Sequence, residues 1–126
     1  MNPMIFDTNI LVAAFLGEEK SARLLAVALK KQDLRLSVVV IAELHAAQIS
    51  EFSTKIDELS KVVPVFAIDM HVARLAGDLK QERRKKRTKT YLPDCFIAAT
   101  ALMYGCTLVT KNKIDFQFPR LKILNT

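Results

Sequence analysis

The sequence has few of the residues that build disulfide-stapled or zinc-bound domains. Only two cysteines, Cys95 and Cys106, and two histidines, His45 and His71, occur among 126 residues. The cysteines form no CxxC pair, and the histidines are too far apart in the chain for the close pairs that zinc sites use. A disulfide framework and a structural zinc site are therefore not expected. Two isolated thiols favour a reducing compartment, with a single disulfide as the less favoured alternative.

Long apolar runs are also missing. The stretch 10–16 is short, follows Asp7 and has no basic residue before it, unlike the start of a secretory signal peptide. No other run approaches the roughly 20 apolar residues that a membrane-spanning helix needs. We therefore expect a soluble cytoplasmic protein with no membrane partner.

Apolar residues are nevertheless plentiful, at 51% of the chain, which is enough for a packed core. Short apolar runs, typical of buried strands, alternate with segments in which apolar residues recur at helical spacing. We predict strands at 3–6, 34–38, 62–68, 107–110 and 122–124. We predict helices at about 10–16, 21–31, 38–50, 53–60, 70–87 and 92–104. This alternation predicts an α/β sandwich on a mostly parallel sheet, and the length fits one domain over residues 1–126.

Residues with capping side chains set the expected helix boundaries. Thr8 or Asn9 is expected to cap the first helix, Ser37 the third and Ser53 the fourth. Gly105 is expected to end the last helix, because glycine adopts the left-handed conformation found after many helices.

The excess positive charge of the chain lies in one segment. Residues 80–89 read KQERRKKRTK, with seven Lys or Arg and one Glu, so they account for the whole net charge of +6. Such a segment is suited to bind the phosphates of a nucleic acid, with Arg83, Arg84, Lys85 and Lys86 as candidate RNA-binding residues. The alternative is a solvated helix end that keeps the protein soluble.

Two acidic residues follow predicted strands directly. Asp7 comes after the first strand, and Asp115 lies in the loop after the fourth. In open parallel sheets, ligands bind beyond the carboxyl ends of the strands, so both positions are candidates for a functional site. Each residue can equally be a turn or helix-start residue.

Two further acids lie on predicted helices. Glu43 has apolar neighbours on its own helix face, where an unpaired charge is unfavourable unless a cation compensates it or the helix exposes it. Asp94 begins a core-facing stripe of apolar residues at helical spacing. Its alternative role is simple, because a negative charge in the first turn of a helix is stabilised by the helix dipole.

Together the four acids predict a metal site at one edge of the sheet. Converging carboxylates repel one another unless a cation lies between them. Oxygen ligands without His or Cys select Mg²⁺ or Mn²⁺ over zinc, and such ions activate water and stabilise a phosphoryl group under attack. The sequence therefore favours metal-dependent phosphodiester chemistry at Asp7, Glu43, Asp94 and Asp115.

At these residues the chain resembles the PIN-domain family. The segments FDTNIL, LSVVVIAEL, LPDCFIAATAL and LVTKNKIDF resemble the four acidic motifs of that family, in family order and over nearly the whole chain. The resemblance implies a three-layer α/β/α sandwich and a Mg²⁺- or Mn²⁺-dependent nuclease that acts on RNA. It also implies the four acids as metal ligands and catalytic residues, with supporting polar groups at Thr8, Asn9, Thr110 and Asn112. Val40 departs from the pattern, because family members often have Ser or Thr at that position.

The short chain is most similar to VapC-type toxins of prokaryotic toxin–antitoxin pairs. That resemblance implies a homodimer and a small antitoxin protein as partners.

Two other functions fit parts of the sequence. A phosphoacceptor receiver-like signalling domain has a similar length and a lysine after a late strand, here Lys111, but Phe6 stands where its first strand would carry a paired acid. A non-catalytic nucleic-acid-binding module would use the basic segment alone. The histidines lie at no ligand spacing, and Phe116 and Phe118 are expected to pack on the sheet rather than to stack on bases.

Overall fold

A computed structural model describes residues 2–126. This part of the chain contains five strands, namely β1 (Met4–Phe6), β2 (Leu34–Ser37), β3 (Val65–Phe66), β4 (Thr107–Thr110) and β5 (Ile123–Asn125). It also contains six α-helices and one 3₁₀-helix, namely α1 (Thr8–Phe15), α2 (Glu19–Lys30), α3 (Val38–Ala46), α4 (Ser50–Ser60), α5 (Met70–Lys85), α6 (Leu92–Met103) and η1 (Lys113–Phe116). None of the helices among residues 2–126 combines the length and the apolar character needed to cross a bilayer.

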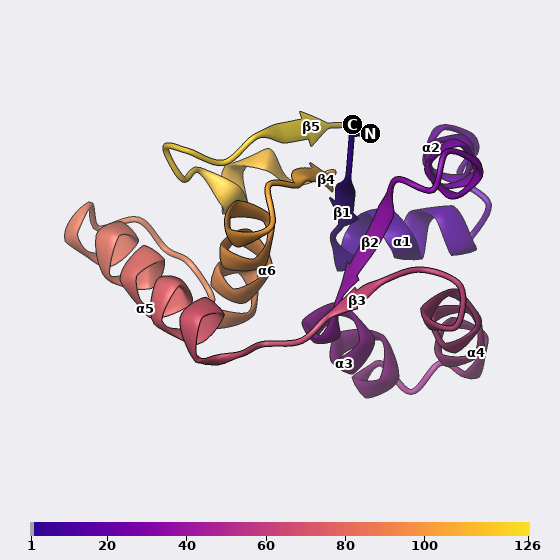
Figure 1. Cartoon of the computed structure of the whole chain (residues 1–126), viewed down its shortest axis with the longest axis horizontal. Helices are drawn as coiled ribbons and strands as arrows, with labels where there is room; N and C mark the ends of the chain where they lie inside the picture. The colour runs from indigo at the N-terminus through magenta and orange to yellow at the C-terminus, as the bar shows by residue number, and fades with distance from the viewer. Residues whose placement is uncertain (1) are drawn as a thin grey trace.

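The strands form one sheet in the order β3-β2-β1-β4-β5, and every neighbouring pair is parallel. Parallel strands need crossover connections, which the helices supply. Helices α5 and α6 lie on one side of the strands, and α1, α2 and α4 lie on the other (Figure 1). The predicted mostly parallel α/β sandwich with three layers is confirmed.

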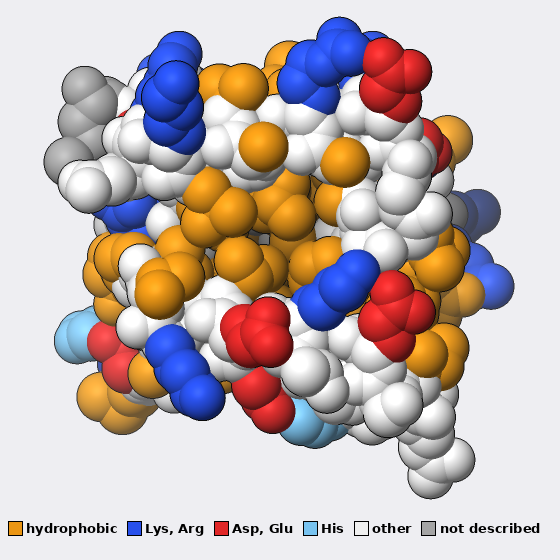
Figure 2. Space-filling view, turned by 90° about the vertical axis from the view of Figure 1, so that its right-hand side faces the viewer, with side chains coloured by type: hydrophobic (Ala, Val, Ile, Leu, Met, Phe, Trp, Pro, Cys, Tyr) orange, Lys and Arg blue, Asp and Glu red, His pale blue; other side chains and the backbone are white. Residues whose placement is uncertain are grey.

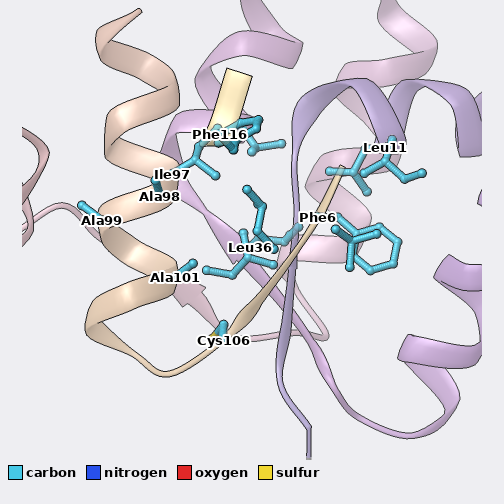
Figure 3. Packing of buried hydrophobic residues seen from close by; sticks show 14 of the residues in the cluster. Phe6, Leu11, Leu36, Ile97, Ala98, Ala99, Ala101, Cys106 and Phe116 are labelled. Carbon is cyan, nitrogen blue, oxygen red and sulfur yellow. The ribbon is translucent and has the colours of Figure 1, made fainter. Parts of the chain in front are cut away.

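The core lies on both faces of this sheet. Ile5 and Phe6 of β1, Leu36 of β2 and Leu108 of β4 are fully buried, because central parallel strands are covered on both sides. Helix α6 presents small residues to the sheet, which lets it pack closely (Figure 3). The core-facing stripe predicted to begin at Asp94 is present, since Ile97, Ala98 and Ala101 are buried.

Several helix boundaries differ from the predicted ones. Helix α1 begins one residue earlier than a Thr8 cap would allow and two earlier than an Asn9 cap would allow, because the carboxylate of Asp7 caps it. Ser37 caps α3 as predicted. Ser53 caps nothing; α4 begins at Ser50, and the Ser53 hydroxyl donates to the carbonyl of Ile49 inside the helix.

Helix α3 and strand β3 are shorter than predicted, and each has a local cause. Helix α3 ends at Ala46 rather than near residue 50, because Gln48 takes the left-handed conformation with φ 57°. Strand β3 has only two residues, as Pro64 directly before it removes a ladder donor. Strand β4 lies at its predicted position, and Gly105 follows α6 with positive φ.

Candidate active site

The strand order creates a crevice beside β1. Strand β2 lies on one side of β1 and β4 on the other, so the connections that leave the carboxyl ends of β1 and β4 diverge. Such switch points are the usual ligand sites of open parallel sheets. Asp7 follows β1, α3 with Glu43 follows β2, and η1 with Asp115 follows β4. Helix α6 leads into β4, so its first turn, with Asp94, lies at the same edge.

Asp7 is the most rigidly held of the four acids. Its side chain is buried, and both carboxylate oxygens accept hydrogen bonds. The backbone N–H of Ile10 donates to Oδ1 at 3.0 Å, and the hydroxyl of Thr110 donates to Oδ2. Burial raises the pKa of Asp7 most, and the charge of Glu43 raises it further, while the hydrogen bonds from Thr110 and Ile10 oppose the rise. Asp7 is thus a fixed carboxylate whose charge is only partly compensated.

Glu43 lies half-buried on α3 and turns toward Asp7. The hydroxyl of Thr8 donates to its Oε1 at 2.6 Å, which links α3 to the first turn of α1. The sequence left open whether a cation compensates Glu43 or the helix exposes it, and the structure shows it partly exposed at the crevice. Val40 is fully buried, and its apolar side chain cannot donate a hydrogen bond. The hydroxyl that donates to Glu43 belongs instead to Thr8.

Asp94 shows that the four acids share one electrostatic environment. It lies half-buried in the first turn of α6. Its pKa is raised to about 6, first by burial and then by the charges of Asp115, Glu43 and Asp7. Each of the other three carboxylates therefore lies close enough to repel it. A helix N-terminus favours a negative charge by up to about 1 kcal/mol at the surface, and this effect does not cancel the repulsion.

A small pocket of about 90 Å³ lies between these side chains. A water molecule occupies about 30 Å³ in the liquid, so the pocket has room for an ion with one or two waters. Its lining combines the four acids with Thr8, Asn9, Ile97 and Phe116. The four acids, which are up to 108 positions apart in the sequence, are therefore brought together.

The chemistry of the donors suits a hard divalent cation. All four acids offer oxygen, and neither histidine nor cysteine lines the pocket. Within residues 2–126, however, no three His, Cys, Asp or Glu side chains stand close enough together to hold one ion as they are placed. A shared ion therefore requires the carboxylates to turn toward one another, and their mutual repulsion opposes that turn until a cation is present.

Of the four predicted supporting polar residues, Thr8 and Asn9 line the pocket, and Thr110 and Asn112 do not. Thr8 and Thr110 donate to Glu43 and Asp7. Asn9 lies exposed at the rim. Asn112 contributes through its backbone, whose N–H donates to the Thr110 hydroxyl oxygen at 2.9 Å. That bond leaves the Thr110 proton free to be donated to Asp7.

The basic segment divides into exposed residues and one buried residue. Arg84, Lys85 and Lys86 are exposed at the end of α5, where they are available to a ligand. Arg83 is only 4% exposed, and its guanidinium donates to backbone carbonyls of other segments. The prediction that Arg83 belongs to an RNA-binding surface is therefore wrong, because a side chain buried in this way cannot reach a phosphate.

The sequence did contain a signal for the burial of Arg83. Val72, Ala76 and Leu79 are the buried apolar residues of α5, and Arg83 continues their spacing of four, three and four positions. The run of positive charge concealed this periodicity.

Other candidate residues have structural roles. Phe116 and Phe118 are buried, as expected for packing rather than base stacking. His45 pairs with Asp57 at 2.8 Å, away from the pocket. Lys111 pairs with Glu18 at 2.7 Å and does not line the acidic pocket, which removes the feature that favoured a receiver-like domain.

The fold and the pocket define a parallel α/β domain with a cluster of carboxylates at its switch point. The family model described as PIN domain matches residues 4–123, so the chain belongs to the PIN-domain family. The resemblance found in the four acidic motifs is thus confirmed.

Solved structures share the fold over nearly their full length. VapBC2 from Rickettsia felis, bound to a DNA fragment from the promoter, is 24% identical with a TM-score of 0.82, covering 98% of this chain and 98% of that chain. DNA-bound VapBC from Salmonella typhimurium is 20% identical with a TM-score of 0.83, covering 99% and 98%. FitAcB from Neisseria gonorrhoeae is 22% identical with a TM-score of 0.72, covering 97% and 96%. No curated protein matches the sequence.

Proposed function

We propose that the protein is a Mg²⁺- or Mn²⁺-dependent endoribonuclease and the toxin of a toxin–antitoxin pair. The observation that carries the proposal is the convergence of Asp7, Glu43, Asp94 and Asp115 on one pocket, in which three carboxylates raise the pKa of the fourth. Four like charges in one small pocket are unfavourable alone and favourable around a divalent cation. Membership of the PIN-domain family supports the same site.

The four acids would hold the ion, and the polar residues around them would fix their orientation. With an ion bound there, the site would gain an activated water molecule and a positive charge that offsets the negative charge developing on a phosphodiester under attack. Thr110 and the Ile10 N–H hold both oxygens of Asp7, and Thr8 holds one oxygen of Glu43. The buried Ile97 and Phe116 form the apolar part of the pocket lining.

The exposed end of α5 would bind the RNA backbone. An acidic pocket repels phosphate, so a nuclease of this kind needs positive charge elsewhere on its surface. Arg84, Lys85 and Lys86 supply that charge. A non-catalytic nucleic-acid-binding module would use the same residues but would need no metal, so the two functions differ in a cleavage assay.

The test compares two aspartate-to-asparagine variants with the unchanged protein. Asp94→Asn removes a pocket charge, whereas Asp78→Asn changes an exposed aspartate of α5 that lines no part of the pocket. RNA cleavage is measured with a chelator and then with Mn²⁺ or Mg²⁺ added back. We expect metal-dependent cleavage by the unchanged protein and Asp78→Asn, and a loss of at least about 100-fold in Asp94→Asn. Undiminished cleavage by Asp94→Asn would contradict the assignment.

We further propose a small antitoxin as a partner. The structural neighbours include VapBC complexes and a toxin–antitoxin complex from Klebsiella pneumoniae. An apolar groove of about 500 Å³ between α2 and α4 offers a surface for such a partner. Hydrophobic side chains gather in the middle of this face, with charged residues around them (Figure 2). Exposed apolar patches of this kind are typical of protein interfaces.

The groove can be tested by changing one residue in it. Val62 is 74% exposed and lines the groove, so Val62→Asp leaves the core intact. We expect this variant to cleave RNA normally and to escape inhibition by the proposed antitoxin, whereas unchanged inhibition would show that the antitoxin does not bind in the groove.

We also propose a homodimer, which the resemblance to VapC-type toxins implies. Light scattering should give twice the mass of the 14.2 kDa chain, and a monomer at micromolar concentration would contradict that part of the proposal.

A further inference from the structure

Among residues 2–126, Arg83 is a buried cation without a carboxylate partner. It lies in the last turn of α5 and is 4% exposed, and no ion pair with Asp or Glu is formed by it within residues 2–126. Its guanidinium donates instead to three backbone carbonyls. Nη1 donates to Gln117 O at 3.0 Å, and Nη2 donates to Ile114 O at 3.3 Å and to Lys89 O at 3.4 Å.

This arrangement is an unfavourable way to fill space in a core. Burying a charge is expensive, and neutral carbonyls compensate it less well than a carboxylate does. The Nε atom of Arg83 is buried with no hydrogen-bond partner, which adds to the penalty. The ring of Phe118, 5.5 Å from the guanidinium carbon, compensates part of the charge. An apolar side chain would fill the same space more favourably. Core packing therefore does not explain why an arginine that donates to three carbonyls stands at this position.

Two of the three carbonyls that Arg83 binds flank the turn that carries Asp115. Ile114 precedes Asp115, and Gln117 follows Phe116, so one guanidinium holds both ends of the Asp115–Phe116 pair. Both residues of the pair line the acidic pocket. The start of the turn is fixed separately, because the Asp115 N–H donates to Asn112 O at 3.0 Å. Arg83 therefore holds the backbone on the C-terminal side of Asp115, at the carbonyl of Gln117.

The geometry points to Arg83 as a positioning residue for Asp115 at the metal site, and we propose that role, which rests on the proposed function. The rigid fork of the guanidinium suits the task, because its donors lie in one plane with fixed separations. Without it, residues 114–117 lose their hydrogen bonds to another element, since the remaining one to β5, from the Lys113 N–H to Asn125 Oδ1, lies at the start of η1, and the Asp115 carboxylate samples more positions. An ion that needs the four carboxylates to converge then binds less tightly.

The test is a double-mutant cycle in Mn²⁺ affinity. Arg83→Met removes the donors and keeps an unbranched side chain of similar length, and Asp115→Asn removes the group that Arg83 is proposed to position. Mn²⁺ dissociation constants are measured by calorimetry for the unchanged protein, both single variants and the double variant. We expect Arg83→Met to weaken Mn²⁺ binding about tenfold in the unchanged protein. In the Asp115→Asn background we expect a change of less than about twofold.

Two controls keep the outcomes distinct. Arg84 is the exposed neighbour of Arg83, so Arg84→Met removes the same charge from α5 and should leave Mn²⁺ affinity unchanged. If Arg83→Met does not fold, the cycle is run with Arg83→Lys, which keeps the buried charge but cannot span three carbonyls. We expect the Lys variant to show the same dependence on Asp115 with a smaller loss.

The results separate the inference from the proposed function. Equal losses of affinity in the two backgrounds would overturn the positioning role, because a general loosening of the fold acts whether or not Asp115 is present. Failure of the unchanged protein to bind Mn²⁺ would overturn the metal site itself and the inference with it. Loss of Mn²⁺ affinity in Arg84→Met would show an effect of charge on α5 rather than of position.

Discussion

Removing the charge of Asp94 should stabilise the protein while it abolishes cleavage. The pKa of Asp94 rises from 3.8 to about 6 on folding, so the folded state binds a proton more tightly than the unfolded chain does. The contribution of Asp94 to stability is therefore greatest below about pH 4 and is lost as the pH rises through about 6, above which the carboxylate is charged in both states. Asp94→Asn removes this penalty, because asparagine has nearly the same shape and no charge.

The size of the effect follows from the shift in pKa. A shift of this size corresponds to about 3 kcal/mol, and solvent screening at a half-exposed side chain reduces it to about 1.5 kcal/mol. The lost interaction with the α6 dipole subtracts about 0.5 kcal/mol. A net gain of about 1 kcal/mol raises the Tm of a chain of this length by about 4 °C.

The assay is thermal unfolding of both proteins from pH 4 to pH 8 in the presence of a chelator. We expect no difference in Tm near pH 4, an advantage of Asp94→Asn that grows as the pH rises from 4 to about 6, and a constant advantage above about pH 7. Saturating Mn²⁺ should reverse the order, since a ligand at 100 times its dissociation constant stabilises the folded state by about 2.7 kcal/mol. A variant that is less stable than the unchanged protein at pH 8 without metal would refute the repulsion among the four acids.

Three further predictions concern other parts of the molecule. Replacing Arg84, Lys85 and Lys86 together by Gln should lower the slope of log affinity for RNA against log salt by about 2, and an unchanged slope would exclude the basic segment from binding. Ser37→Ala should lower the free energy of unfolding in urea by about 1 kcal/mol, because the hydroxyl that accepts from the Val39 N–H caps α3, and no change would show that the cap is dispensable. Neither cysteine should react with a thiol reagent in the folded protein at pH 8, because both are buried and burial raises the pKa of both thiols; rapid labelling before unfolding would contradict this.

The sequence predicted the sheet well because parallel strands carry a strong signal. Central strands are covered on both faces, so they appear as short continuous apolar runs, and β4 lies where such a run was seen. Asp7, Asp94 and Asp115 could be placed at one edge, because in a parallel sheet the strands end, and the helices that return to the next strand begin, at the same edge. The sequence could not give the rotation of α3, and that rotation decides that Glu43 faces the crevice.

The errors arose where one residue serves two purposes or where packing replaces a local signal. Asp7 was weighed as either a site residue or a turn or helix-start residue, yet it both lines the acidic pocket and caps α1 through its Oδ1, and the cap was expected from Thr8 or Asn9. Helix α4 begins without a capping side chain; Phe52 in its first turn packs on Phe15, with ring centroids 6.1 Å apart, and such a tertiary contact leaves no trace in local sequence. Arg83 was grouped with its charged neighbours, although its helical spacing places it on the buried face of α5.

The most direct test of the central claim is the position of Mn²⁺ in a crystal of the unchanged protein. Anomalous scattering from bound manganese locates the ion without reference to activity. We expect one or two peaks within ligand distance of oxygens from Asp7, Asp94 and at least one of Glu43 and Asp115, with the side chains turned inward relative to their positions without metal. A protein that binds manganese elsewhere, or an empty acidic pocket at millimolar Mn²⁺ and neutral pH, would contradict the claim that these four carboxylates form a metal site.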